Sequence, residues 1–322
     1  MEEAALQRQI AELSARLARL RGAAPPPAPP SPHFLLLLAD SALPIGSFAF
    51  SSGLESCLAH AAAWPAFFPL SMAALASAAL PFVLAAHRRP CALVALDDEA
   101  DAAAVCAVAR RASVAQGRAL LGVWERSFAP ALRDSGAASC SSSAAASATS
   151  SSSTTASATS SSSAAASATS SSSTTASAAS SSSAASSASS PEAAASILAH
   201  FAALLRDSSS ASAADDVPPP VAAHLAPLFG AVCAFAGLDL RQAAYVFMLS
   251  HAKALVSAAV RASVFGPYHG HRLLAGHQLR HMIDALVDRE WDTPSDEAGQ
   301  SVPIMDLWVG RHELLYSRIF NS

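Results

Sequence analysis

The sequence has few charged residues, and its cysteines form no recognisable framework. Asp, Glu, Lys and Arg make up 14% of the 322 residues, and the net charge of -4 provides no basic field for binding nucleic acid. The five cysteines lie far apart and include no Cys-x-x-Cys pair. Two glutamates stand near the start, where a secretory signal would carry basic residues. Together these absences favour a cytoplasmic protein with reduced thiols.

The motifs of common enzyme sites are also missing. The sequence contains no Walker A loop, no Gly-x-Gly-x-x-Gly, no His-Glu-x-x-His and no Gly-x-Ser-x-Gly. It therefore predicts a protein that is not an enzyme. The alternative from another class is a metal-dependent helical enzyme that uses His277 and His281, one helical turn apart, with Asp284 or Glu290 as a further ligand.

A long uncharged run, 61–86, could cross a bilayer by its length alone. Three prolines, Pro65, Pro69 and Pro81, are expected to interrupt it, and small residues make its centre only weakly hydrophobic. We therefore expect a buried helix over about 71–87 in a protein without membrane attachment.

Two segments differ in composition from the rest of the chain. Residues 1–32 combine an amphipathic helical pattern with a proline-rich linker. Residues 139–190 repeat a Ser/Ala/Thr unit that has no large apolar side chain, so this insert is expected to be disordered. The remainder of 33–322 is long enough for one large helical domain. The apolar positions of the first segment are Leu6, Ile10, Leu13, Leu17 and Leu20.

Apolar residues recur at helical spacing through this domain. Gly237 is expected to end one helix and Asp239 to cap the next. Gly117 weakens its helix unless a neighbouring helix packs closely there, which is the expected reason for it. The expected helices are 97–128 as one or two helices, 191–206, 221–236, 240–264, and a further helix after the turn that begins at Phe265.

The stretch 35–55 joins an apolar helical run to a tight turn. It contains Leu-Ala-Asp-Ser-Ala-Leu-Pro-Ile-Gly-Ser-Phe-Ala-Phe-Ser-Ser-Gly-Leu-Glu. Ser51 or Ser52 is expected to cap the following helix, with Glu55 in its first turn near the positive end of the helix dipole. This stretch resembles the N-terminal signature of the urease accessory protein F (UreF) family. The signature-loop residues are Ser41, Pro44, Gly46, Phe48, Ser51 and Gly53.

The C-terminal stretch 302–320 is the second match. Its sequence, Val-Pro-Ile-Met-Asp-Leu-Trp-Val-Gly-Arg-His-Glu-Leu-Leu-Tyr-Ser-Arg-Ile-Phe, resembles the closing motif of the same family. Pro303 is expected to open a helix that carries Arg311 and Arg318 two turns apart on one side. Shorter matches occur at 110–121 and 255–261, and Gly-Pro-Tyr at 266–268 resembles the eukaryotic branch.

The resemblance implies an all-α protein, here a single domain of roughly eight to ten helices. It implies a homodimer that bridges the D/H-type accessory protein and the nickel-carrying G-type GTPase on apo-urease, and that regulates GTP hydrolysis during nickel insertion. No cofactor would be bound stably; whether the nickel in transit contacts this chain is left open. Motif matching assigns partner contact or GTPase control to Glu55, Arg261, Arg311, His312, Tyr316, Ser317 and Arg318. The candidate metal ligands are His277 and His281, although neighbouring histidines on a polar helix are usually just exposed or hydrogen-bonded.

Overall fold

A computed structural model of the chain describes residues 32–60, 64–133, 191–210 and 221–321. The chain divides into two units, Met1–Ser31 and Pro32–Ser322. The first unit, with the expected N-terminal helix and linker, lies outside the described residues, and so does the expected insert at 139–190. All regular structure within the described ranges is helical, which confirms the predicted all-α fold.

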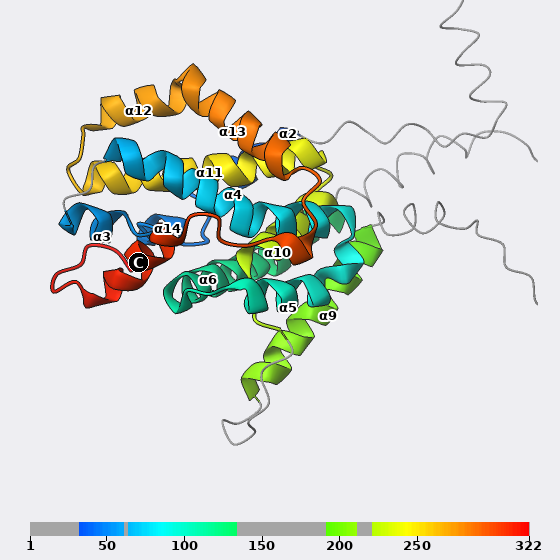
Figure 1. Ribbon diagram of the computed structural model, residues 1–322. Helices are drawn as coiled ribbons and strands as arrows, with labels where there is room; N and C mark the ends of the chain where they lie inside the picture. The colour runs from blue at the N-terminus through cyan, green and yellow to red at the C-terminus, as the bar shows by residue number, and fades with distance from the viewer. Residues whose placement is uncertain (1–31, 61–63, 134–190, 211–220, 322) are drawn as a thin grey trace, which may run out of the picture. The chain divides into compact units, whose positions relative to one another are not determined.

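Figure 1 shows the helices of the second unit. The last turns of α6 run on through a π-helical turn, Trp124–Phe128, into 129–133. Among the described residues the α-helices are α2 (Pro32–Ala39), α3 (Leu54–Ala59), α4 (Trp64–Arg88), α5 (Leu93–Ala103), α6 (Ala107–Val123), α9 (Pro191–Ser210), α10 (Leu225–Phe235), α11 (Leu240–Arg261), α12 (Pro267–Ala275), α13 (His277–Glu290) and α14 (Pro303–Arg311).

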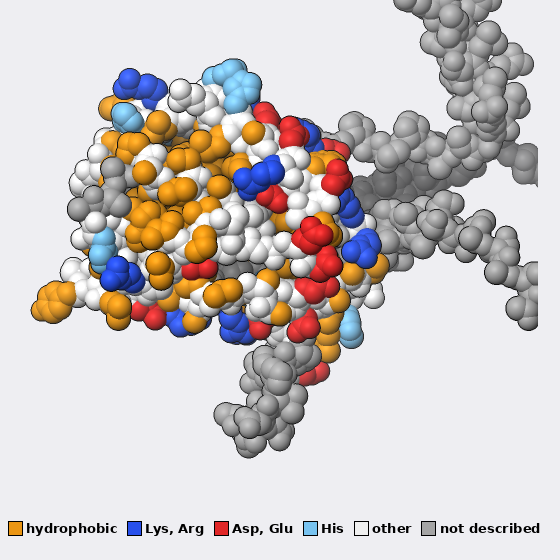
Figure 2. Space-filling view, in the orientation of Figure 1, with side chains coloured by type: hydrophobic (Ala, Val, Ile, Leu, Met, Phe, Trp, Pro, Cys, Tyr) orange, Lys and Arg blue, Asp and Glu red, His pale blue; other side chains and the backbone are white. Residues whose placement is uncertain are grey.

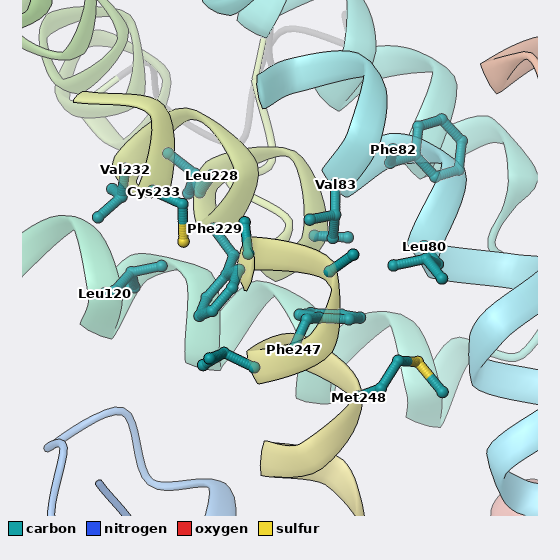
Figure 3. Close-up of a cluster of buried hydrophobic side chains, with 14 of the residues drawn as sticks. Leu80, Phe82, Val83, Leu120, Leu228, Phe229, Val232, Cys233, Phe247 and Met248 are labelled. Carbon is teal, nitrogen blue, oxygen red and sulfur yellow. The ribbon is translucent and has the colours of Figure 1, made fainter. Parts of the chain in front are cut away.

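Helices α4, α10 and α11 form the centre of the core, with α6 against α10 (Figure 3). Phe82 and Val83 of α4 are buried together with Phe229 of α10 and Phe247 of α11. The backbones of α4 and α10 approach closely, because a Cβ on Gly230 would lie 2.2 Å from the carbonyl oxygen of Val83. This close packing of small and aromatic side chains accounts for the absence of Asp, Glu, Lys and Arg from α4 before Arg88.

Helix α4 is longer than the sequence predicts, since it begins at Trp64 and continues through Pro69 and Pro81. The expectation that prolines interrupt it was wrong; burial on several sides outweighs the lost backbone hydrogen bonds. Helices α4 and α11 are both long and apolar enough to cross a membrane, but 56% of the most apolar window of each is buried in this core. Core helices of soluble proteins have the same properties, so the two helices are weak grounds for a membrane assignment.

The start of α10 also differs from the prediction. Residues 221–224 are extended, and the helix begins only at Leu225. Its end follows the sequence: Gly237 has a φ of 75°, and Asp239 forms a capping box with Gln242 at the start of α11. The extended residues 221–224 pass directly over α6, where a Cβ on Gly117 would lie 2.1 Å from the carbonyl oxygen of Ala223. Gly117 is thus required by an extended segment and not, as expected, by a helix.

Gly117→Ala should therefore destabilise the domain by about 1–3 kcal/mol, because the added methyl group must displace backbone. A Cβ on Gly122, in the same helix, would meet no atom of another described segment within 4 Å. Gly122→Ala should stabilise the helix by about 0.5–1 kcal/mol. Urea unfolding of both variants measures the difference; two changes of the same sign would contradict the close approach at Gly117.

Candidate functional site

The signature loop, residues 40–53, joins α2 to α3 and turns at residues with a left-handed backbone. Gly46 has a φ of 75° and Gly53, the residue that caps α3, a φ of 86°. The side chain of Ser51, and not that of Ser52, accepts a hydrogen bond from the backbone N–H of Glu55, at 3.4 Å. A Cβ on Gly53 would lie 3.0 Å from the backbone nitrogen of Val309, so the loop also lies tightly against α14.

The C-terminal segment folds back onto this loop (Figure 1). Helix α14 begins at Pro303, as predicted, but ends at Arg311; a short 3-10 turn, His312–Leu314, and an extended stretch follow. We call residues 312–321 the C-terminal tail. The backbone N–H of Asn321 donates a hydrogen bond of 2.8 Å to the carbonyl oxygen of Ala49. The expectation that Arg311 and Arg318 share one side of a helix was therefore wrong, because the chain must leave the helix to reach the loop.

Glu55 joins the signature loop to the C-terminal tail. Its carboxylate accepts hydrogen bonds from His312 Nε2 at 3.0 Å and from the backbone N–H groups of Ile319, at 2.7 Å, and Phe320, at 3.2 Å. The Glu55 side chain is 14% exposed, and His312 is fully buried. Nδ1 of His312 has no hydrogen-bond partner in the described part of the chain, so the ring is held through Nε2 alone. The sequence placed Glu55 at a helix start, but its main partners lie in the tail.

Arg261, at the end of α11, completes this arrangement. Its guanidinium group donates a hydrogen bond to the carbonyl oxygen of Phe48 and lies over the ring of Phe320, 4.5 Å from its centroid. Phe320 is only 5% exposed, so the end of the tail belongs to the domain core. Arg261 thus contacts the signature loop and the tail at once.

The other predicted residues of this group lie on the surface. Arg311, Tyr316, Ser317 and Arg318 are all exposed. The seven candidates therefore divide into three that hold the tail in place and four that the tail and the end of α14 present to solvent. Large apolar side chains are exposed beside them, namely Phe48, Leu314, Tyr316 and Ile319.

A cavity of about 380 Å³ lies beneath the signature loop, bounded by α4, α6, α11 and α14. Its walls are mainly apolar. Within them His251 Nε2 lies 3.0 Å from Ser71 Oγ, and Lys253 Nζ donates to the carbonyl oxygen of Ala39 at 2.6 Å. Burial lowers the pKa of His251 to about 4, so this ring is neutral at pH 7. The polar groups of the cavity are thus used mainly in holding neighbouring segments together.

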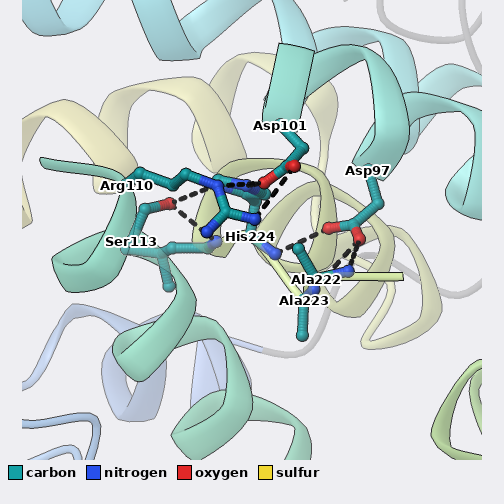
Figure 4. Close-up of polar contacts among 8 residues, drawn as sticks. Asp97, Asp101, Arg110, Ser113, Ala222, Ala223 and His224 are labelled. Atoms are coloured by element: carbon teal, nitrogen blue, oxygen red, sulfur yellow. Dashed lines mark hydrogen bonds and ion pairs between the residues drawn. The ribbon is translucent and has the colours of Figure 1, made fainter. Parts of the chain in front are cut away.

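A second polar cluster, shown in Figure 4, connects α5 and α6 to residues 222–225. Asp97 is fully buried, and its carboxylate accepts hydrogen bonds from three successive backbone N–H groups, those of Ala222 (2.7 Å), Ala223 (2.9 Å) and His224 (2.6 Å). Neither Asp97 nor His224 was singled out in the sequence. The sequence did contain a signal for Asp97, because it shares an apolar face of α5 with Leu93 and Ala100. A carboxylate on such a face is buried and needs hydrogen-bond partners.

Asp101, one turn further along α5, pairs with both Arg110 and His224. Arg110 forms two hydrogen bonds to its carboxylate, at 2.6 and 2.9 Å, and His224 Nε2 lies 2.8 Å away. Burial would raise the pKa of Asp101, but these hydrogen bonds lower it below its ordinary value, and the same contact raises the pKa of Arg110. Ser113 Oγ lies 3.1 Å from His224 Nδ1 and accepts the N–H of Leu225 at 3.2 Å. The cluster resembles a Ser–His–Asp arrangement, but it anchors the start of α10.

The predicted metal pair lies on α13, where both histidines are exposed and their Nε2 atoms are 2.8 Å apart. The carboxylates proposed as further ligands have other partners. Asp284 lies 3.9 Å from Arg241, and Glu290 binds Arg289 and Thr293. The described ranges contain no group of three or more His, Cys, Asp or Glu residues placed to hold a metal ion. The three-ligand site of the alternative enzyme is therefore not found there.

Fold and site together define an all-helical protein in which the signature loop and the C-terminal tail meet at Glu55. Its buried polar groups mainly hold separate segments of the chain together. The UreF family model matches residues 61–278, and the chain belongs to this family. Family membership supports a role in urease maturation, and the relatives are named as accessory proteins.

Three relatives illustrate the range of the family. An uncharacterized UreF-like urease accessory protein from Schizosaccharomyces pombe is 27% identical over 295 residues, which cover 90% of this chain and 97% of the relative. Urease accessory protein F from Oryza sativa subsp. indica is 31% identical over 100 residues, 31% of this chain and 38% of the relative. Urease accessory protein UreF from Granulibacter bethesdensis is 35% identical over 94 residues, 29% of this chain and 39% of the relative.

Proposed function

We propose that this chain acts as a cytoplasmic scaffold in urease maturation. In this proposal it bridges the nickel-carrying G-type GTPase and the D/H-type accessory protein on apo-urease, and it regulates GTP hydrolysis while nickel is inserted. The chain supplies binding surfaces and no catalytic group, and nickel is cargo of the assembled complex. Family membership supports the general role.

The observation that carries the proposal is the tail held on the signature loop. Glu55 binds His312 and two backbone N–H groups of the tail, and Arg261, itself exposed, lies over the ring of Phe320. Arg311, Tyr316 and Arg318 are exposed to solvent. Exposed aromatic and arginine side chains on a preorganised backbone are the residues that most often dominate protein interfaces. The tail is accordingly the proposed docking element for the GTPase.

A second surface supports the proposed homodimer. Figure 2 shows apolar side chains gathered on the face that carries α4, α11 and α12 in Figure 1. Pro65 and Pro69 of α4 and Tyr268 of α12 are exposed. A second copy of the chain would remove such an apolar face from water, since continuous apolar areas of this kind usually mark interaction sites.

Arg318→Ala tests the docking element. Because Arg318 is exposed, the variant should fold normally, but recruitment of the GTPase should weaken by about 2 kcal/mol, roughly 30-fold. The measurement is co-purification with the GTPase and the D/H-type protein, with and without nickel. Arg126→Ala, an exposed arginine in the π-helical turn Trp124–Phe128, is the matched control and should recruit normally. Normal recruitment by the double variant Tyr316→Ala/Arg318→Ala would exclude the exposed part of the tail as the docking element.

A further inference from the structure

Lys253 of α11 is the only lysine in the sequence, in which all other strongly basic residues are arginines. It is partly buried and lines the cavity beneath the signature loop. Its Nζ donates one hydrogen bond, to the carbonyl oxygen of Ala39. An ammonium group has three N–H donors, so two remain for other acceptors. Within the described ranges no carboxylate forms an ion pair with this lysine.

The other Asp and Arg side chains along the cavity have partners of their own. Arg110 binds the carboxylate of Asp101 through two hydrogen bonds. Asp306 accepts a hydrogen bond of 3.0 Å from a side-chain amide, and Asp40, which is exposed, accepts one from a backbone N–H. Among the described residues of the cavity wall, Lys253 is therefore the cation that is placed to meet an anion. Its ammonium is a compact charge on a flexible stem, unlike the broad planar group of an arginine.

The body of the cavity is apolar. Phe82, Phe229 and Phe247 contribute aromatic walls from α4, α10 and α11, and Figure 3 shows these three rings in the centre of the core. Ser250 and Ser257 line the cavity on α11, one turn to either side of the lysine. A volume of about 380 Å³ lies within the range of small-molecule sites, which combine apolar walls with a few polar groups that orient the ligand.

We propose that this cavity reversibly binds a small amphipathic carboxylate, an aliphatic acid of medium chain length. Its carboxylate accepts charge-assisted hydrogen bonds from Lys253, and its hydrocarbon chain leaves water to lie along the aromatic walls. Leu43, Ile45 and Phe50 of the signature loop line the same cavity, so the bound chain also contacts this loop from inside. Occupancy should therefore stabilise the loop and raise the melting temperature of the protein.

Calorimetric titration of the full chain with decanoate tests the proposal. We expect saturable binding of one molecule per chain, and we expect butyrate, which lacks the long chain, and decanol, which lacks the charge, to bind at least tenfold more weakly. Lys253→Gln should weaken decanoate binding about tenfold and leave decanol binding unchanged. Arg126→Gln removes one positive charge from an exposed position outside the cavity and should bind decanoate as the wild type does.

The single lysine also allows a chemical measurement at the site. An amine-selective acylating ester should modify only Lys253 and the α-amino group of the chain. Saturating decanoate should slow acylation of Lys253 several-fold and leave the α-amino group unaffected, as followed by mass spectrometry. Equal acylation rates of Lys253 with and without decanoate would overturn the proposal.

A cavity-filling variant tests the apolar part of the site. Ala254 lines the cavity, so Ala254→Phe should abolish decanoate binding, whereas Ala115→Phe, at an exposed position of α6 outside the cavity, should not. If Ala254→Phe fails to fold, acylation of the wild-type chain still decides the question. Absence of saturable binding, equal affinity for decanol and decanoate, or normal decanoate binding by Lys253→Gln would contradict the proposed site. None of these measurements involves a urease partner, so the scaffold proposal is tested separately.

Discussion

Asp97→Asn is expected to lower the free energy of unfolding by about 3 kcal/mol or more. The buried carboxylate accepts N–H groups from three successive residues, 222–224, and these hydrogen bonds hold the extended segment that starts α10. An asparagine offers one acceptor oxygen and turns an NH₂ group toward donors. At least one buried N–H would lose its partner, and α10, which packs on α4, would lose its fixed start.

Asp98→Asn provides the control for this prediction. Asp98 is the next residue and is exposed, so the same change of charge should alter stability by no more than about 0.5 kcal/mol. Urea unfolding curves, with the slope compared as well as the midpoint, measure both variants. Similar small effects for the two variants would show that Asp97 does not anchor residues 222–224.

The sequence predicted most helices because their signals are local. Apolar residues at helical spacing lie within one segment, and Gly237 and Asp239 act on the backbone next to them. The errors arose where distant residues decide the local structure. Residues 221–224 have the composition of a helix, yet Asp97, more than 120 residues away, binds their N–H groups in an extended form. Pro69 and Pro81 stay within α4 because packing in the core outweighs their local effect.

The candidate site was predicted in its parts but not in its arrangement. Motif matching selected Glu55, His312 and Arg261 individually, and spacing gave Glu55 its place at the start of α3. That Glu55 binds His312 could not be read from the sequence, because the two residues are 257 positions apart. The tail itself was predicted as helix, since its apolar residues are spaced like one, whereas its backbone N–H groups bind Glu55 and the signature loop.

This arrangement changes the expected effect of Glu55→Ala. Interaction with the helix dipole alone would give a loss of roughly 0.5–1 kcal/mol. The carboxylate also accepts three hydrogen bonds, from His312, Ile319 and Phe320, in a largely buried position. Hydrogen bonds to a charged group contribute about 1.5–3 kcal/mol each but are not additive within one cluster, so we expect a total loss of about 3 kcal/mol.

The loss should be concentrated in the tail, because the helices that form the core centre do not depend on Glu55. Hydrogen exchange should show that the N–H groups of Ile319 and Phe320 lose their protection in Glu55→Ala while those of α10 keep it. Glu313→Ala is the control: Glu313 lies in the same tail but pairs with Arg111 at the surface, where an ion pair contributes at most about 1 kcal/mol.

If Glu55 acts by holding the tail, Glu55→Ala should lose GTPase recruitment, as Arg318→Ala does. A variant that recruits normally but hydrolyses GTP at a changed rate would instead assign Glu55 to GTPase control, and full tail protection in Glu55→Ala would contradict the role of Glu55 in fastening the tail.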